Sequence, residues 1–371
     1  MRAFAAAALV CSLLVSTPAA AKKKKKEEET QTLQLPKELP TAIQAETGRL
    51  QFYTTPLSAR GLLSAQVRNA LKALWRQAHG ATIYKIRAFV AGSGDVRRVR
   101  DLVSATFTDK KQPLPVLSLA QAGALPLDGA QVVLEAIAGG KKVVNPNGLV
   151  FISPRVATSD NPVAGVAPLT AQSLAGLRQA VQAAGAQSAD VLRVTCFLSS
   201  LENLAASRQL VEAEYPRAAL DYIQTQRAPT GGLAACEAVA RLHSALGVPL
   251  KLMNVPGEPP QKDQSGLALV GAPWVVLTGM QISFGYREAD SRLAFERLVK
   301  ELEKSSVRPA DVAYAQYYAL SSGLAAQVRA LRPQFFDGAH PPAGTLLLFQ
   351  GLPAMDAGFA VDVVAVKPPS P

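Results

Sequence analysis

The feature that most constrains the fold of this 371-residue chain is an order of elements that occurs three times. In the middle of the chain, Leu174, Leu177 and Val181 line one face of a predicted helix. A loop ending at Asp190, a β-rich strand from Val191 to Leu198 and a second helix follow. The apolar spacing thus changes from helical to strand-like and back, which predicts a helix–strand–helix segment.

The same order occurs upstream and downstream. The upstream copy has a helix with Val67, Leu71 and Leu74 on one face, the strand 83–90 and a helix 95–106 that Asp95 can cap. The downstream copy has a helix with Phe295, Leu298 and Leu302, the strand 312–320 and a helix near 323–331. Recurrence at a period of about 110 residues indicates an internal repeat.

Each copy is also expected to open with a hairpin and to close with two strands. The predicted hairpins are 42–54, 143–153 and 268–279. The predicted closing pairs are 116–122 with 132–138, 233–242 with 248–255, and 345–349 with 359–366. We therefore predict an α+β fold with three tandem units at 41–140, 141–258 and 265–367.

The N-terminus is typical of a secretory signal peptide. Arg2 precedes an apolar run to Val15, and an Ala-x-Ala sequence ends at Ala21, where we expect cleavage. A buried core helix is the alternative, but Pro18 would break it. Residues 22–40 are charged and read as a linker. These features predict a secreted or periplasmic protein with no membrane association after cleavage, since no later apolar stretch approaches about 18 residues.

The net charge of +11 does not by itself indicate nucleic-acid binding. Arg2 contributes one positive charge, and the run Lys22–Lys26 with three following glutamates contributes two, which leaves +8 for the remaining chain. No basic stretch there has interleaved aromatic residues, so we predict no nucleic-acid partner. Three histidines and no Cys-x-x-Cys pair predict neither a metal site nor a cofactor.

Cleavage of the signal would leave only Cys196 and Cys236. They could pair in an oxidising compartment, but we favour two buried, unpaired thiols.

Several segments resemble the RidA/YjgF (Rid) family of enamine/imine deaminases. The segment ADVLRVTCFLSSLENL (189–204), together with CEAVARL (236–242) and LEAIA (134–138), carries the resemblance. It implies a chorismate-mutase-like α+β unit that assembles as a trimer with small-molecule pockets between subunits. Three copies in one chain would then form a monomeric, intramolecular pseudo-trimer.

The resemblance also implies where the chemistry would lie. In the family an arginine grips the carboxylate of a 2-imino acid, and alignment on the closing strands puts Leu117, Ala234 and Gly344 at its position. The family glutamate that positions the hydrolytic water is matched by Glu135, Lys251 and Asp362. Glu135 and Asp362 are therefore the candidate catalytic residues.

Three further residues are candidate ligand-binding groups. Cys236 matches a family cysteine that lines the pocket, although a lone cysteine is more often a packing residue. Arg155 and Arg227 could replace the lost arginine, and Arg241 is expected in a structural ion pair.

The sequence thus predicts an exported Rid-like protein that binds a small metabolite between its repeats, with lost or altered deaminase activity. If active, it would hydrolyse 2-iminobutanoate or 2-iminopropanoate. The alternative is an inactive scaffold or interaction protein that uses only the fold.

Overall fold

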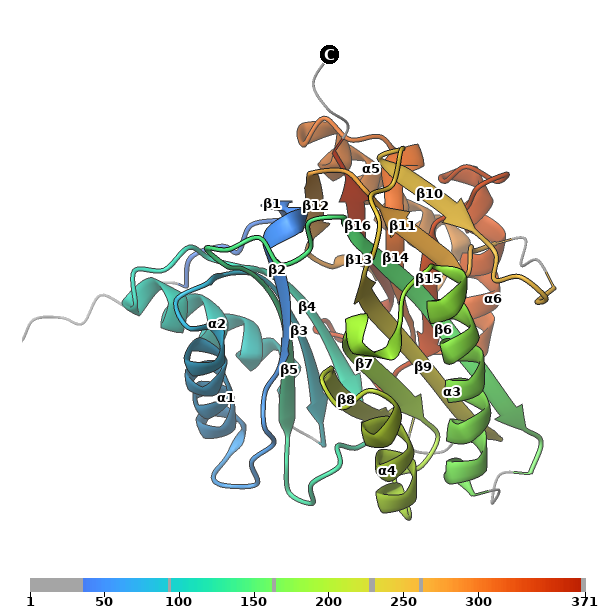
Figure 1. The fold of residues 1–371 in the computed structure, drawn as a ribbon. Helices are drawn as coiled ribbons and strands as arrows, with labels where there is room; N and C mark the ends of the chain where they lie inside the picture. The colour runs from blue at the N-terminus through green and yellow to red at the C-terminus, as the bar shows by residue number, and fades with distance from the viewer. Residues whose placement is uncertain (1–35, 93–94, 162–164, 227–230, 260–262, 368–371) are drawn as a thin grey trace, which may run out of the picture. The chain divides into compact units, whose positions relative to one another are not determined.

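The computed structural model describes residues 36–92, 95–161, 165–226, 231–259 and 263–367 (Figure 1). The predicted signal peptide, most of the predicted linker and Arg227 lie outside these residues. The described chain is a mixed α+β fold with three sheets and six α-helices. None of these helices is long and apolar enough to cross a membrane.

The first sheet is built from four strands and has two helices packed beside it. Its strand order is β2 (Leu50–Thr54), β5 (Val132–Gly139), β3 (Thr82–Ala91) and β4 (Val116–Ala122). Helix α1 (Leu63–Ala78) buries the predicted apolar face and ends at His79 and Gly80, which both have positive φ. Helix α2 (Val96–Asp109) starts at Asp95, whose side chain accepts a hydrogen bond from the backbone of Arg97.

The second sheet has six strands in the order β10, β11, β6, β9, β7 and β8. Their bounds are β10 (Leu250–Met253), β11 (Leu267–Val270), β6 (Leu149–Ser159), β9 (Gly232–Arg241), β7 (Val191–Leu198) and β8 (Ala219–Gln224). Helices α3 (Val166–Ala183) and α4 (Leu204–Glu214) pack together beside it.

The third sheet also has six strands, in the order β1, β12, β16, β14 and β15, with β13 paired to β16. Their bounds are β1 (Ala42–Glu46), β12 (Trp274–Thr278), β16 (Ala357–Val366), β14 (Val312–Ala319), β15 (Ala343–Leu348) and β13 (Gln281–Phe284). Helices α5 (Glu288–Lys304) and α6 (Ser322–Leu331) accompany it.

One pairing pattern recurs in all three sheets. The long central strand (β3, β7 or β14) is antiparallel to the last strand (β5, β9 or β16) and parallel to the strand before it (β4, β8 or β15). A bulge interrupts the antiparallel register near the start of each central strand. The recurring order read from the sequence therefore corresponds to a recurring strand topology.

The predicted hairpins are wrong: in 42–54 and 268–279 the strands on the two sides of the turn pair with different sheets, and in 143–153 only the strand after the turn, β6, is present. Strand β1 pairs with β12, and β2 pairs with β5. Strand β11 pairs with β6, whereas β12 pairs with β1 and β16. In the region 143–153, Val144 and Asn145 donate backbone hydrogen bonds to Gly48. These exchanges link the three sheets in a closed cycle.

The strand order of the second sheet also corrects the prediction for its closing strands. The segment 233–242 was predicted as the first of the closing pair, but β9 is the last strand of the pattern, and β8 takes the preceding place. The predicted strand 248–255 is the edge strand β10, which pairs with β11.

The prediction of two unpaired cysteine thiols is also wrong. Cys196 on β7 and Cys236 on β9 stand opposite each other in the register and form a disulfide. Neighbouring antiparallel strands hold opposite Cα atoms close enough for such a bridge.

Candidate functional site

A layer of charged and polar side chains lies where residues from all three sheets meet. We call it the central charged layer. The strand register defines its corresponding members as Arg87, Glu135 and Ser118 in the first sheet, Thr195, Glu237 and Asp221 in the second, and Gln316, Asp362 and Thr345 in the third. Two residues earlier on the central strands lie Lys85, Arg193 and Tyr314. Apolar clusters around Phe89, Phe197 and Phe349, and around Phe52 and Phe151, contribute other parts of the core.

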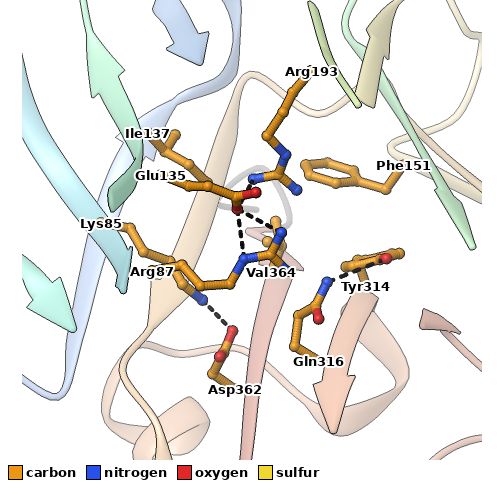
Figure 2. Close-up of a pocket in the computed structure, with 10 residues that line it drawn as sticks. All are labelled: Lys85, Arg87, Glu135, Ile137, Phe151, Arg193, Tyr314, Gln316, Asp362 and Val364. Atoms are coloured by element: carbon orange, nitrogen blue, oxygen red, sulfur yellow. Dashed lines mark hydrogen bonds and ion pairs between the residues drawn. The ribbon is translucent and has the colours of Figure 1, made fainter. Parts of the chain in front are cut away.

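The Arg87 guanidinium joins carboxylates from two sheets, Glu135 of its own (Figure 2) and Glu237 of the second. Its Nε donates to Glu135 Oε2 at 2.6 Å, and its Nη2 donates to Glu237 Oε1 at 2.9 Å. Arg193 lies 3.4 Å from each of the same two carboxylates. Thr195 Oγ1 also donates to Glu135 Oε1 at 2.5 Å. Glu135 is therefore held both by Arg87 of its own sheet and by Thr195 and Arg193 of the next.

Asp362 and Glu237 are held across sheets in the same way. Asp362 forms an ion pair with Lys85 and accepts a hydrogen bond from Ser118 Oγ at 2.6 Å, both from the first sheet. Glu237 accepts from Tyr314 Oη at 3.0 Å and from Thr345 Oγ1 at 2.5 Å, both from the third sheet. Each carboxylate thus ties its own sheet to a neighbour.

The electrostatics of the layer are balanced. Glu135, Glu237 and Asp362 are each 1% exposed and face three cations. Burial alone would raise the pKa of Glu237, but Arg87 and Arg193 lower it overall. Burial lowers the pKa of Lys85 despite its pairing with Asp362. A buried ion is tolerated only when partners of opposite charge and hydrogen bonds replace its water, and this layer supplies both.

Asp221 is the fourth carboxyl group of the layer and forms no ion pair within the described part of the chain. Burial, together with the negative charge of Glu135, raises its pKa well above the usual range. Its Oδ1 accepts a hydrogen bond from the backbone of Tyr222, whereas Oδ2 has no partner among the described residues. The corresponding residues Ser118 and Thr345 are neutral and bond to Asp362 and Glu237. A protonated Asp221 would likewise be neutral.

The space inside the layer is too small for a substrate. The cavity lined by Arg87, Glu135, Arg193, Gln316 and Asp362 has a volume of about 30 Å³, room for about one water molecule (Figure 2). Its charged groups are bound to one another. Chemically, this arrangement is suited to joining the sheets rather than to turning over a metabolite.

Larger spaces lie where strands of one sheet approach another. A groove of about 680 Å³ runs between β2 and the start of β8. A second, of about 510 Å³, lies between β10 and residues near Arg308 and His340. A third, of about 120 Å³, lies beside β4 and is narrowed by a backbone hydrogen bond from Met280 to Leu117. Pockets that hold small molecules usually measure about 300–1,000 Å³.

The groove between β2 and β8, which we call the β2–β8 groove, combines apolar and cationic walls. Phe52, Tyr53 and Leu220 contribute apolar surface, and Arg217 and Arg241 contribute positive charge. Arg241 is paired with Asp190 at 3.4 Å, in agreement with its expected structural role. Arg217 is exposed and forms no ion pair with the described residues. The groove therefore offers an unpaired guanidinium next to an apolar wall.

The structure brings Glu135 and Asp362 into one layer but leaves Lys251 outside it. Lys251 is on the edge strand β10 and lines the 510 Å³ groove. Glu237 takes the corresponding place, because β9 is the last strand of its sheet. A signal for it was present in the sequence: LEAIA (134–138), CEAVA (236–240) and VDVVA (361–365) carry their carboxylates at the same position.

The corrected register also changes one of the three positions aligned with the family arginine. In each sheet, one residue of the parallel strand pairs with the residue just before the central-layer position. These residues are Leu117, Leu220 and Gly344, so Leu220 replaces Ala234 in that set. None of the three has a cationic side chain. Near Gly344 the space is occupied, since Ser153 Oγ accepts the Gly344 amide at 2.8 Å.

The remaining predicted ligand-binding residues are placed as follows. Cys236 is in the disulfide and has no free thiol. Arg155 is buried and forms an ion pair with Glu258 at 2.5 Å. Arg227 lies outside the described residues. The sequence reasoning did not single out Lys85, Arg87 or Arg193, because strand charges usually face solvent and nothing local marks these as buried.

No group of three or more metal-ligating side chains is found in the described part of the chain.

Comparisons with known proteins find similarity only among solved structures. No protein-family model matches the sequence, and no curated protein matches it significantly. A Rid-family protein of unknown function from Yersinia pestis is 17% identical, with a TM-score of 0.31, and covers 32% of this chain and 100% of its own. A YjgF-family protein from Neisseria meningitidis is 14% identical, with a TM-score of 0.24, over 33% of this chain and 97% of its own. A putative translation initiation inhibitor from Vibrio vulnificus is 21% identical, with a TM-score of 0.24, over 31% and 94%.

Proposed function

We propose that this chain is an exported protein of three degenerate RidA/YjgF-type copies that binds a small carboxylate in the β2–β8 groove and does not hydrolyse imines. The export signal, with cleavage near Ala21, rests on the sequence of residues 1–21. The disulfide between Cys196 and Cys236 supports it, because such bonds persist mainly in oxidising compartments.

The recurring topology supports the three copies, and the strand exchanges support a monomeric pseudo-trimer. In a trimer of separate chains, each exchanged strand would come from a neighbouring subunit. Here β1, the first strand of the described chain, pairs with β12, more than 200 residues later. This pairing closes the cycle within one chain, so the proposal needs no second copy.

The proposal rests on one difference: the charged groups of the central charged layer are paired with one another, whereas the β2–β8 groove has an exposed arginine at its wall. The carboxylates that the family resemblance assigns to catalysis are all bound to cations in a layer with room for about one water. The three positions aligned with the family arginine hold Leu117, Leu220 and Gly344. In contrast, the β2–β8 groove measures about 680 Å³, and Arg217 at its wall is exposed and has no ion-pair partner among the residues that the structure describes. A guanidinium is well suited to bind a carboxylate.

Binding is tested with 2-oxobutanoate and phenylpyruvate as probes, using the mature chain and isothermal titration calorimetry. We expect binding of at least one probe, weakened roughly ten-fold or more by Arg217→Ala, since a hydrogen bond to a charged group contributes about 1.5–3 kcal/mol. Leu220→Trp, which fills the groove, should abolish it. Arg329→Ala, an exposed arginine on α6, is the matched control and should leave it unchanged.

Catalysis is tested with freshly generated 2-iminobutanoate. We expect the mature chain to add nothing to the rate of hydrolysis in buffer. A protein-dependent rate that Glu135→Gln removes would contradict the proposal and restore the enzyme hypothesis. Absence of binding by both probes would instead favour the scaffold alternative.

A further inference from the structure

The positive charge of the described chain is concentrated on one pair of helices. Helix α1 carries three cations and no carboxylate, and α2 carries three cations and two carboxylates, so together their net charge is +4. Helices α3 and α4 carry two cations and two carboxylates. Helices α5 and α6 carry five of each. The positive charges that are scattered along the sequence are therefore brought together on α1 and α2 in the fold.

On α1 the cations form a single exposed row. Arg68, Lys72 and Arg76 are four residues apart, so they follow one another along the same side of the helix, and all three are exposed. Like charges at this spacing destabilise a helix by about 0.2–0.5 kcal/mol per pair. Helix α5 instead has opposite charges at helical spacing, such as Arg292 with Glu288 and Lys304 with Glu301. The row on α1 is therefore unfavourable for the helix that carries it.

Helix α2 adds cations where they oppose the helix dipole. Arg97 and Arg98 lie in its first turn and are exposed, although the start of a helix favours negative charge. Arg97 is partly compensated by Asp95 at 3.2 Å. Lys110 and Lys111 follow its last turn, where the dipole favours them. Folding thus explains the two lysines but not the two arginines.

Helices α1 and α2 lie side by side against the first sheet (Figure 1). The exposed cations of the two helices and of the residues directly after α2 form what we call the basic helix face: Arg68, Lys72, Arg76, Arg97, Arg98, Arg100, Lys110 and Lys111. On α1 the charged row from Arg68 to Arg76 extends along about 12 Å of the helix.

In contrast to the sequence-based expectation of no membrane association after signal cleavage, we propose that the basic helix face binds the surface of an anionic phospholipid bilayer through the lipid phosphates. The fit is one of charge: several unpaired cations near an anionic membrane each contribute favourably, and none needs a shaped pocket. Leu62, which precedes α1, is 80% exposed and could enter the headgroup region. Its loop and that of Leu127, 42% exposed, are held together by Gln66, which bonds to Gly61 and Gly129.

The same face is less suited to nucleic acid. Its aromatic side chain, Trp75, packs on Phe107 with ring centroids 5.0 Å apart and is covered by Lys110 Nζ at 4.9 Å. Single-stranded nucleic acids are usually held by aromatic side chains that bases can stack on. Lipid phosphates need the cations alone, which is what α1 and α2 expose.

Flotation of the mature chain with vesicles tests the proposal. The vesicles are phosphatidylcholine alone or with 30% phosphatidylglycerol, at low and high salt. We expect binding only to the anionic vesicles, weakened by salt because the charges are exposed. The variant Arg68→Gln, Lys72→Gln, Arg76→Gln should bind roughly a hundred-fold more weakly, since each cation near such a surface contributes about a five-fold change in partition.

The control variant Arg208→Gln, Lys300→Gln, Arg329→Gln removes the same charge from exposed positions on α4, α5 and α6. It should bind within two-fold of the unaltered chain. Because the basic run Lys22–Lys26 is present in both variants, a difference between them reports on α1. Equal losses in the two variants, or equal binding to neutral vesicles, would overturn the proposal. So would binding to a DNA oligonucleotide in the absence of vesicle binding.

Discussion

The central charged layer and the basic helix face use the same residue types in opposite ways. In the layer, Arg87 and Arg193 are nearly fully buried, and each faces Glu135 and Glu237. On the face, Arg68 and Arg76 are exposed and have no carboxylate on their own helix. The fold depends on the buried pairs of the layer, because removal of one partner would leave the other as a buried charge with neither water nor a counter-ion. The exposed cations of the basic helix face are accessible to a binding partner.

The largest expected effect comes from unpairing the layer. Glu237→Ala leaves Arg87, Arg193 and Tyr314 without a common acceptor and should lower the free energy of unfolding by about 3–5 kcal/mol. Glu214→Ala, which breaks the partly exposed pair with Arg178 on the surface, should cost less than about 1 kcal/mol. Urea unfolding at pH 7 measures both, and Glu237→Gln serves if the alanine variant does not fold. Similar small losses for the two sites would remove the distinction between layer and surface.

A gain in stability is expected at Asp221. Its pKa is raised in the folded state, so its contribution to stability is complete below its unfolded pKa and is lost as the pH rises toward the folded pKa. Asp221→Asn removes this loss of stability at higher pH, because asparagine does not ionise in either state. The variant should match the unaltered chain near pH 4 and become more stable by up to about 1.4 kcal/mol per pH unit above that.

Urea unfolding of both proteins from pH 4 to pH 7 measures the Asp221 effect. Groups with the opposite dependence, such as Glu237, whose lowered pKa makes its contribution disappear as the pH falls, are present in both and cancel in the difference. A difference in stability that does not change with pH would mean that Asp221 is ionised in the fold.

The smallest effect is expected on the basic helix face. The triple variant Arg68→Gln, Lys72→Gln, Arg76→Gln should unfold at the same urea concentration as the unaltered chain or be more stable by up to about 1 kcal/mol, because two like-charged pairs are removed. Circular dichroism during unfolding measures this. A loss above 1 kcal/mol would show that the row supports the fold and would weaken its interpretation as a docking surface.

Much of the secondary structure could be predicted from local patterns. Strand Val191–Leu198 and helix α1 agree with the apolar spacing of their residues. Asp95 is the cap that its residue type indicates. The three hairpins failed because turn signals such as Asn145-Pro146-Asn147-Gly148 mark a change of direction but not the partner of the strand that follows.

Only part of the candidate site could be predicted from the sequence. Glu135 and Asp362 could be matched through the closing strands, whereas Glu237 was missed because an extra edge strand, β10, displaced the alignment. The pairing of Cys196 with Cys236 required knowing that their strands are neighbours.

The sequence by itself determined the elements and their threefold recurrence, because helix and strand periodicities act over a few residues. Tertiary structure alone decided which strands exchange, since Ala42 meets Thr278 only when distant segments fold together. It also decided the role of each charge. Arg87 can be buried because Glu237, 150 residues away, neutralises it, whereas Arg68 stays in water on a helix that carries no carboxylate of its own.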